Sequence, residues 1–260
     1  MIYAIGDIHG QKTMLDRALA LVAADGGEDA RIVFLGDYTD RGPDSRAVIA
    51  TLREGCAQGR NWVCLKGNHD RMFHRYVTAG HAHDTRIASG LGWLNPRLGG
   101  DTTLGSYGLS AQMTFAPHTR GTPEQILSAQ VGTDRVTPAQ LLDMARDLVP
   151  HDDLAFIDGL PLHHTEDGLL FVHAGIRPGV PLAAQAEDDL LWIREGFLDD
   201  PTDHGALVVH GHTALETPVH FGNRVDLDGG AGYGRPLVPA VFDGTSCWLL
   251  TESGRERLEA

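Results

Sequence analysis

Carboxylate, amide and imidazole side chains follow five apolar runs in this chain, each in a short loop that contains glycine. The loops carry Asp7 with His9, Asp37, Asn68 with His69, His173, and His210 or His212. Oxygen and imidazole donors suit Mn, Fe, Zn or a mixed pair of ions, and the lack of thiolates argues against a structural zinc site. Asp7 and His9 are two positions apart, so both side chains can face one point in an extended loop. The pattern therefore predicts a metal centre built from loops.

The chemistry that suits this donor set is hydrolysis at phosphorus. Two divalent ions about 4 Å apart hold a water and two phosphoryl oxygens between them, and they lower the pKa of the water until hydroxide forms near neutral pH. A phosphate ester needs that nucleophile, and it also needs positive charge beside the transferring group. The residues thus predict a phosphoester hydrolase.

Strands and helices alternate in the first third of the expected fold. Residues 2–5, 32–35 and 62–65 are short apolar runs of the kind that form buried strands. Residues 13–24 and 44–56 have the apolar spacing of helices. A β-α-β-α-β order favours parallel strands with right-handed crossovers. Ligands bind at the carboxyl ends of such strands, where the polar loops can converge.

The composition changes after this unit. Residues 81–150 are punctuated by Gly, Thr, Pro and Ser, and we interpret them as an inserted helical cap with helices at 123–131 and 138–148. Another helix is expected at 187–195. Further strands are expected at 154–157, 169–172, 207–209, 218–221, 224–227, 238–242 and 247–251. The sequence therefore favours one domain over residues 1–260 that carries a cap.

The motifs and their order resemble those of the calcineurin-like metallophosphoesterases, and more narrowly those of the bacterial phosphoprotein phosphatases. That family reads G-D-x-H-G, G-D-x-x-D-R-G and G-N-H-D/E, followed by a strand-end histidine and a late histidine. This chain reads GDIHG at 6–10, GDYTDRG at 36–42, GNHD at 67–70, HAG at 173–175 and GHT at 211–213. The resemblance implies an α/β fold, a four-layer α/β/β/α sandwich of two mixed sheets, with the helical cap inserted.

The same resemblance implies a ligand set for two divalent ions. Asp7 and His9 would hold the first ion, and Asp37 would bridge both. The second ion would take Asn68, His173 and His212, with His212 preferred to His210 because it stands in the G-H-T pattern. Manganese is the expected metal, with Fe, Zn, Ni or Mg as alternatives.

Five further residues acquire catalytic roles from the resemblance. His69 would be the general acid that protonates the leaving-group oxygen, and Asp70 would orient its imidazole. Asp40 would support His69 or the bound water. Arg41 and Arg194 would grip the phosphate, because a planar guanidinium binds two phosphate oxygens at once.

The expected reaction is direct attack of metal-bridging hydroxide on a phosphomonoester, without a phosphoenzyme. The favoured activity is that of a serine/threonine protein phosphatase, and the G-G-x-x-T stretch at 99–103 is a weak cue toward the bacterial group. Symmetrical hydrolysis of dinucleoside tetraphosphates is the main alternative, followed by hydrolysis of small phosphate esters. A non-catalytic, metal-bound interaction module is a further hypothesis. Tyr233, in the glycine-rich run 229–234, either contacts substrate or lies in a plain turn.

Composition restricts the partners. The formal net charge is -14 and no basic stripe is visible, which argues against a nucleic-acid binder. No stretch is apolar enough to span a membrane, and the N-terminus lacks the features of a secretory signal. Three cysteines at unrelated spacings indicate reduced thiols in a cytoplasmic protein. The expected substrates are phosphoproteins, small phosphate esters or nucleotides.

Overall fold

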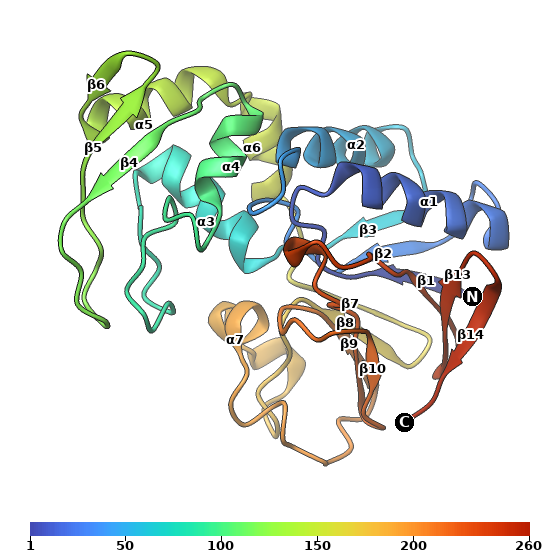
Figure 1. The fold of residues 1–260 in the computed structure, drawn as a ribbon. Helices are drawn as coiled ribbons and strands as arrows, with labels where there is room; N and C mark the ends of the chain where they lie inside the picture. The colour runs from blue at the N-terminus through green and yellow to red at the C-terminus, as the bar shows by residue number, and fades with distance from the viewer.

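Two β-sheets lie face to face in the computed structural model, which describes all of residues 1–260 (Figure 1). The first sheet has the strand order β14-β13-β12-β1-β2-β3. Its strands are β1 (Ile2–Ile5), β2 (Ile32–Phe34), β3 (Trp62–Cys64), β12 (Ala240–Asp243), β13 (Ser246–Thr251) and β14 (Gly254–Leu258). β1, β2 and β3 are parallel, as the β-α-β-α-β pattern predicts, while β12 adds to β1 in the antiparallel sense. This sheet is therefore mixed.

The second sheet is also mixed. Its order is β10-β11-β9-β8-β7, in which β11, β9 and β8 are parallel and the two edge strands are antiparallel to their neighbours. The strands are β7 (His163–Glu166), β8 (Leu169–Val172), β9 (Leu207–His210), β10 (Val219–His220) and β11 (Arg224–Asp226). The carboxyl ends of its central strands lie at the same edge of the molecule as those of β1, β2 and β3. The contacts there show this: His173 after β8 and His212 after β9 lie beside Asn68 after β3, and His173 also lies beside Asp37 after β2.

Alternating side chains of the strands build separate apolar layers. Ala4 of β1 belongs to the cluster between the two sheets, together with Phe171 and Val209 of the second sheet. Its neighbours Tyr3 and Ile5 belong instead to the cluster under the helices on the outer face. This alternation follows from the two-residue period of a strand, and it leaves each sheet with two buried faces.

Helices cover both outer faces of the sandwich. α1 (Lys12–Gly26) and α2 (Ser45–Ala57) lie on the first sheet, and α7 (Glu187–Trp192) lies on the second (Figure 1). Leu190 of α7 packs into one buried cluster with Leu170 and Val208 of the strands beneath it. The predicted four-layer α/β/β/α sandwich with two mixed sheets is confirmed.

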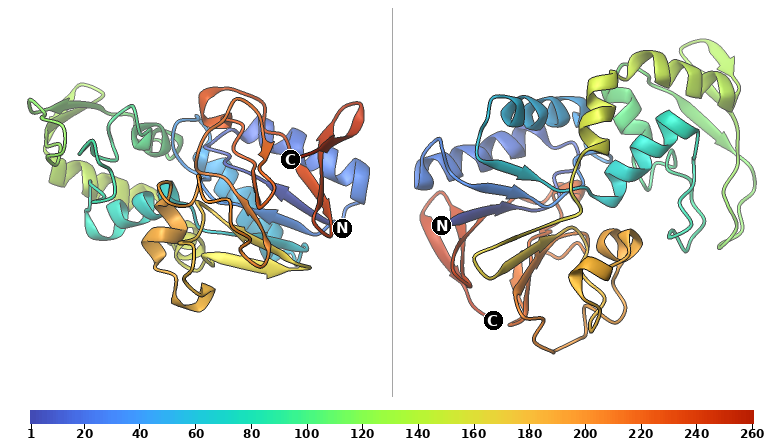
Figure 2. Two further views of the ribbon diagram at one scale, coloured as in Figure 1. Left: turned by 90° about the horizontal axis from the view of Figure 1, so that it is seen from below. Right: turned by 180° about the vertical axis from the view of Figure 1, so that it is seen from behind.

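The segment expected to form the cap, residues 81–150, lies to one side of the sandwich (Figure 2). It begins after α3 (Asn68–Ala79) and contains α4 (Gly100–Ser106), α5 (Pro138–Leu148) and a three-stranded antiparallel sheet in the order β4-β5-β6. The strands are β4 (Gln112–Phe115), β5 (Ile126–Val131) and β6 (Asp134–Val136). We keep the word cap for residues 81–150.

Two elements were predicted with the wrong type. The helix expected at 123–131 is mostly strand β5, which pairs on both sides with β4 and β6. The strand expected at 154–157 lies inside helix α6 (His151–Asp158), which begins after Pro150 and carries two aspartates in its first turn. A short apolar run has no period that separates strand from helix, and the tertiary partners decide. The cap is therefore mixed α and β rather than helical.

No helix of the structure combines the length and the apolar character needed to cross a bilayer.

Candidate metal centre

Six candidate ligands come together at the edge where the strands of both sheets end. Asp7 and His9 follow β1, and Asp37 follows β2. Asn68 opens α3 directly after β3, while the late histidines follow β8 and β9. All six are buried: Asp7, His9, Asp37, Asn68, His173 and His212. The structure thus assembles residues that are up to 205 positions apart in the chain.

Asp37 lies between two groups of donor atoms. His9, Asp37 and His69 form one group and Asp37, His173 and His212 form the other, each with its donor atoms within 4.8 Å of one another. His9 Nε2 is 3.5 Å from Asp37 Oδ2, and His173 Nε2 is 3.5 Å from Asp37 Oδ1. The two oxygens of one carboxylate therefore face two different sets of imidazoles.

Asp7 completes the first group from the side of β1. Its Oδ2 is 3.9 Å from His9 Nε2, and its carboxylate accepts a hydrogen bond from the backbone N–H of His212. Burial raises the pKa of Asp7, and the nearby carboxylates of Asp228 and Asp37 raise it further. Buried carboxylates in mutual repulsion are an arrangement that a cation stabilises.

Asn68 completes the second group. Its Oδ1 lies 2.8 Å from His173 Nε2 and 2.8 Å from His212 Nδ1. The opposite ring nitrogen of His173 lies 2.9 Å from the carbonyl oxygen of Leu35, so it carries the proton and leaves Nε2 with a lone pair. An imidazole lone pair, an amide oxygen and a carboxylate oxygen then face one another, which fits a bound divalent ion.

The charge states of these residues also fit metal binding. Burial lowers the pKa values of His9, His173 and His212, so their rings are neutral near pH 7 and keep a free lone pair. Burial opposes ionisation of Asp37, but the positive charge that the surrounding imidazoles carry when protonated outweighs it and lowers the pKa of this carboxyl. His9 Nδ1 lies 2.7 Å from the carbonyl oxygen of Thr39, which again leaves Nε2 to face the centre.

A family model described as calcineurin-like phosphoesterase matches residues 1–233. The chain belongs to this family. Its members are metal-dependent phosphoesterases that typically bind two divalent ions, and the two buried groups around Asp37 are the candidate positions in this chain.

Similar proteins carry two kinds of name. The serine/threonine-protein phosphatase 1 of Salmonella typhimurium is 39% identical over 72 residues, which are 27% of this chain and 30% of that protein. The symmetrical bis(5'-nucleosyl)-tetraphosphatase of Janthinobacterium sp. is 31% identical over 176 residues, 68% of this chain and 44% of that protein. The matches therefore span less than half the length of these curated relatives. A solved structure described provisionally as a diadenosine tetraphosphatase has a TM-score of 0.60 at 20% identity, covering 95% of this chain and 91% of that one, and shows the shared fold.

This member of the calcineurin-like family holds His69 against Asp40. His69 Nδ1 donates to Asp40 Oδ2 at 2.6 Å, and both side chains are buried. Nε2 of the same ring lies 3.3 Å from the guanidinium of Arg41. By distance His69 also groups with His9 and Asp37, so geometry leaves it two roles, ligand or acid.

Asp70 has a different role from the expected one. Its Oδ2 accepts hydrogen bonds from the backbone N–H groups of Asp37 and Gly67, and its Oδ1 accepts from the N–H of Tyr38. The carboxylate is turned toward the loop after β2 rather than toward His69. The expectation that Asp70 orients His69 is therefore corrected: Asp40 contacts the imidazole, and Asp70 ties the Asp37 loop to the start of α3.

The loops around the centre have unusual backbone conformations. Six residues other than glycine have left-handed φ values, and five of them lie here: His9, Asp37, Asp40, Arg41 and His212, with φ of 47°, 54°, 73°, 65° and 67°. Such conformations cost free energy and persist only where surrounding contacts impose them. Their concentration at one edge marks this region as the functional one.

Three arginines line a pocket of ≈390 Å³ beside the metal residues. Arg41 Nη1 donates to His9 Nε2 at 2.7 Å, so this guanidinium must move aside when His9 binds an ion. Arg194 donates to the carbonyl oxygen of His212 at 3.2 Å. The third, Arg235, was not anticipated from the sequence, although it directly follows the glycine-rich run 229–234. Tyr233 lies between Arg41 and Arg235, whose guanidinium carbons are 4.8 and 5.6 Å from its ring centre.

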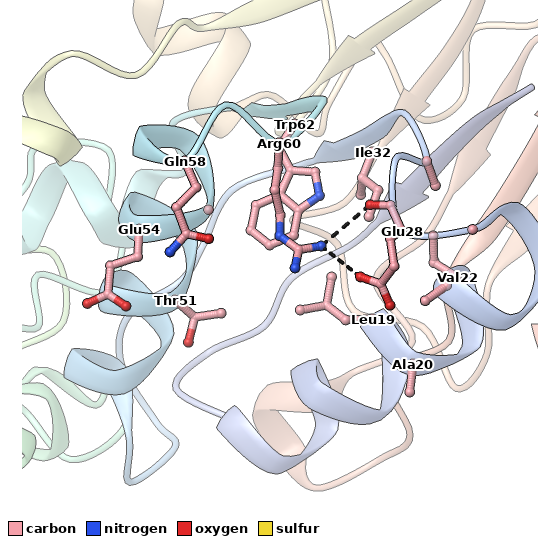
Figure 3. Close-up of a pocket in the computed structure, with 14 residues that line it drawn as sticks. Leu19, Ala20, Val22, Glu28, Ile32, Thr51, Glu54, Gln58, Arg60 and Trp62 are labelled. Carbon is pink, nitrogen blue, oxygen red and sulfur yellow. Dashed lines mark hydrogen bonds and ion pairs between the residues drawn. The ribbon is translucent and has the colours of Figure 1, made fainter.

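Other candidates lie elsewhere. His210 is fully buried but packs away from the donor groups, where Arg224 donates to its Nε2 at 3.1 Å. A separate pocket of ≈340 Å³ lies between α1 and α2, with Arg60 and Glu28 paired at 3.2 Å across it (Figure 3). None of the residues that line it belongs to the metal centre.

Proposed function

We propose that this chain is a dinuclear, manganese-dependent phosphatase that hydrolyses phosphomonoesters in the manner of serine/threonine protein phosphatases. The observation that carries the proposal is the position of Asp37, whose two carboxylate oxygens face two separate sets of buried imidazoles. Asp7, His9 and Asp37 would hold the first ion, and Asp37, Asn68, His173 and His212 the second. Manganese suits the mixture of carboxylate, amide and imidazole donors.

The residues of the chain divide the remaining work. Bound ions would supply a water of lowered pKa and positive charge for the phosphoryl oxygens. Arg41 and Arg194 line the pocket above the centre and orient the phosphate through paired N–H groups. His69, held by Asp40, gives a proton to the leaving oxygen from its Nε2, which faces the site.

Two features support a protein phosphatase-like substrate. One is the likeness over 72 residues to the Salmonella enzyme that is named a serine/threonine-protein phosphatase. The other is Tyr233, whose side chain is exposed at the rim beside Arg41 and Arg194. We infer a rim open to a protruding phosphorylated side chain. The three cysteines form no disulfide, which supports a cytoplasmic setting.

Symmetrical hydrolysis of dinucleoside tetraphosphates is the second candidate, and Arg235 is the observation that favours it. One phosphoryl group needs no more than the two guanidiniums of Arg41 and Arg194, and a third in the same pocket suits a longer phosphate chain. The exposed ring of Tyr233 could stack on a base. A relative with that printed activity aligns with 68% of this chain.

A non-catalytic, metal-bound module is the third candidate, and the complete set of ligands together with the His69–Asp40 pair argues against it. Activity on p-nitrophenyl phosphate with added manganese separates these classes. A folded protein that binds manganese without turnover would exclude the enzyme.

The deciding experiment compares kcat/KM for a phosphoserine peptide, diadenosine tetraphosphate and p-nitrophenyl phosphate under one set of conditions. We expect the phosphopeptide to be the better substrate, with manganese the best activating ion among Mn, Fe, Zn, Ni and Mg. A higher value for the tetraphosphate, abolished selectively in Arg235→Ala, would replace the proposal with the second candidate.

A further inference from the structure

Asp40 is completely buried, and the cap supplies two of the three donors to its carboxylate. Asp40 Oδ2 accepts from His69 Nδ1 at 2.6 Å and also from Trp93 Nε1 at 2.8 Å. Its other oxygen, Oδ1, accepts from the hydroxyl of Thr103 at 2.7 Å. Trp93 and Thr103 are 53 and 63 residues farther along the chain, both within the cap. The carboxylate that faces His69 is thus held by two donors from the inserted segment.

Thr103 also fixes the backbone of Asp40. The N–H of Asp40 donates to Thr103 Oγ1 at 2.8 Å, so one hydroxyl accepts from the backbone and donates to the side chain of the same residue. Because Asp40 has a φ of 73°, its backbone is in a conformation that contacts must impose. The pair of bonds sets both the backbone and the rotamer of Asp40.

The two glycines before Thr103 bring the cap close enough for these bonds. Gly99 accepts a hydrogen bond on its carbonyl from the N–H of Arg41, and a Cβ at Gly99 would lie 2.2 Å from that nitrogen. A Cβ at Gly100 would lie 2.5 Å from the indole ring of Trp93. The three fixed positions of the G-G-x-x-T stretch are therefore explained by their contacts: Gly99 with Arg41, Gly100 with Trp93, and Thr103 with Asp40.

We propose that Trp93 and Thr103 are positioning residues for the general acid, so that the cap forms part of the machinery that delivers the proton. The inference rests on the proposed function of His69. In the step concerned, water oxygen forms a bond to phosphorus, and the bond between phosphorus and the leaving oxygen breaks with its electron pair going to that oxygen. The proton on His69 Nε2 moves to the leaving oxygen, the attacking water releases one proton to solvent, and the ring regains a proton from solvent. Asp40 stabilises the charged ring only if its Oδ2 stays aimed at Nδ1.

A positioning role for Trp93 and Thr103 can be distinguished from general destabilisation by how the rate depends on the leaving group. A general acid matters little when the leaving oxygen is already a weak base, as in p-nitrophenolate, and it matters much for an alkoxide. Loss of positioning should therefore slow the hydrolysis of an alkyl phosphate far more than that of p-nitrophenyl phosphate. Loss of metal or of folded protein would slow both substrates equally.

The experiment measures kcat for phosphoserine peptide and for p-nitrophenyl phosphate, together with bound manganese, in Trp93→Phe and Thr103→Val. Thr103→Val keeps the volume of the side chain, Trp93→Phe keeps an aromatic ring of smaller volume, and each variant removes a donor. For the phosphoserine peptide we expect a loss of about 10- to 100-fold, a part of the roughly 100- to 10,000-fold that a positioned acid supplies. The loss on p-nitrophenyl phosphate should be a small fraction of that, with unchanged metal content. Thr103→Ser, which restores the hydroxyl, should recover most of the lost rate.

Tyr107→Phe is the matched control. Tyr107 is buried near the same region, and its hydroxyl donates to Asp153 at 2.9 Å without touching Asp40. Its removal should leave the ratio of the two rates at the wild-type value. His69→Asn provides the reference for complete loss of the acid.

The outcomes separate the inference from the function on which it rests. If His69→Asn changes the ratio strongly and both folded cap variants leave it unchanged, the positioning role is wrong while the acid role stands. If the two rates fall in parallel in the cap variants, Trp93 and Thr103 are merely structural. If His69→Asn retains the wild-type ratio, the acid role fails and the inference falls with it. If only one of Trp93→Phe and Thr103→Val folds, that variant alone tests the positioning role.

Discussion

The sandwich and the cap contribute different kinds of residue to one site. Every candidate metal ligand follows a strand of the sandwich, whereas the cap contributes none of them. The cap instead contributes Trp93 and Thr103, which hold Asp40 behind His69. In the proposed mechanism, ion binding therefore depends on the sandwich, and the positioning of the proton donor depends partly on the cap. On this proposal, an inserted segment supports the acid of the centre without contributing a metal ligand.

The two regions meet at consecutive strained residues, Asp40 and Arg41. Both have left-handed φ values, and both are hydrogen-bonded to the cap through their backbone N–H groups. Variants on either side of this junction should therefore have separable effects on metal content, stability and turnover.

Asp37→Asn should have the largest effect because it removes the shared negative charge from both groups of donors. We expect manganese to be lost from both positions, and turnover to fall by more than the about 10- to 100-fold that loss of an outer partner of a metal ligand costs. Metal analysis after gel filtration, with steady-state rates, measures both. Asp143→Asn, on the exposed face of α5, is the control. Two fully bound ions in the Asp37 variant would contradict the bridging role.

Asp70→Asn tests the corrected role of this residue within the sandwich. The new amide would place an N–H₂ group against backbone N–H groups, so the free energy of unfolding should fall by about 2–4 kcal/mol. Rates on p-nitrophenyl phosphate and phosphoserine peptide should fall together. Urea unfolding and the two rates provide the measurement. A selective loss on the phosphoserine peptide would instead show that Asp70 acts on His69.

Gly99→Ala tests the junction from the side of the cap. Its φ is 91° and the new Cβ would lie 2.2 Å from Arg41 N, so we expect a loss of about 1–3 kcal/mol in unfolding free energy and weaker substrate binding through Arg41. Gly108→Ala is the matched control, since φ is 93° there and a Cβ would meet nothing within 4 Å. Equal losses in both variants would show that backbone conformation alone, and not the contact with Arg41, is responsible.

Thr137→Ala should have the smallest effect. The Thr137 hydroxyl accepts from the N–H of Gln140 at the start of α5, and removal of such a bond at a helix N-terminus costs about 1 kcal/mol. The substitution lies in the cap but away from Asp40, so both rates and the metal content should stay at wild-type values. A shift in the ratio of the rates would mean that the whole cap, rather than the Trp93 and Thr103 contacts, controls the acid.

Much of the fold and of the candidate site could be predicted because short, local sequence patterns indicate the strands and the residues that follow them. The parallel strands β1 to β3 end in motifs whose glycines and carboxylates follow buried apolar runs directly, so type and place agree within a few residues. β5 and α6 were predicted wrongly because their apolar runs are too short to show a period. Residues 126–131 form strand β5 because they pair with β4 and β6, and residues 151–158 form helix α6 because the first turn after Pro150 favours a helix.

The partner of His69 could not be derived from spacing. Asp70 is adjacent in sequence, but helical geometry at the start of α3 turns its carboxylate to the amides of the neighbouring loop. Asp40, 29 residues earlier, reaches the ring because the loop after β2 takes left-handed turns. Trp93 stands in no motif that would have identified it, and Arg235 only follows a glycine-rich run.

The sequence by itself determined the donor types, their order and their attachment to strand ends, because these depend on residue chemistry and on the two-residue period of buried strands. Tertiary structure alone decided which carboxylate faces His69, which residues hold that carboxylate, and that a third arginine reaches the pocket. The contacts of Asp40 with His69, Trp93 and Thr103 join segments 29 to 63 residues apart through strained turns and close glycine packing, and no local pattern encodes such distances.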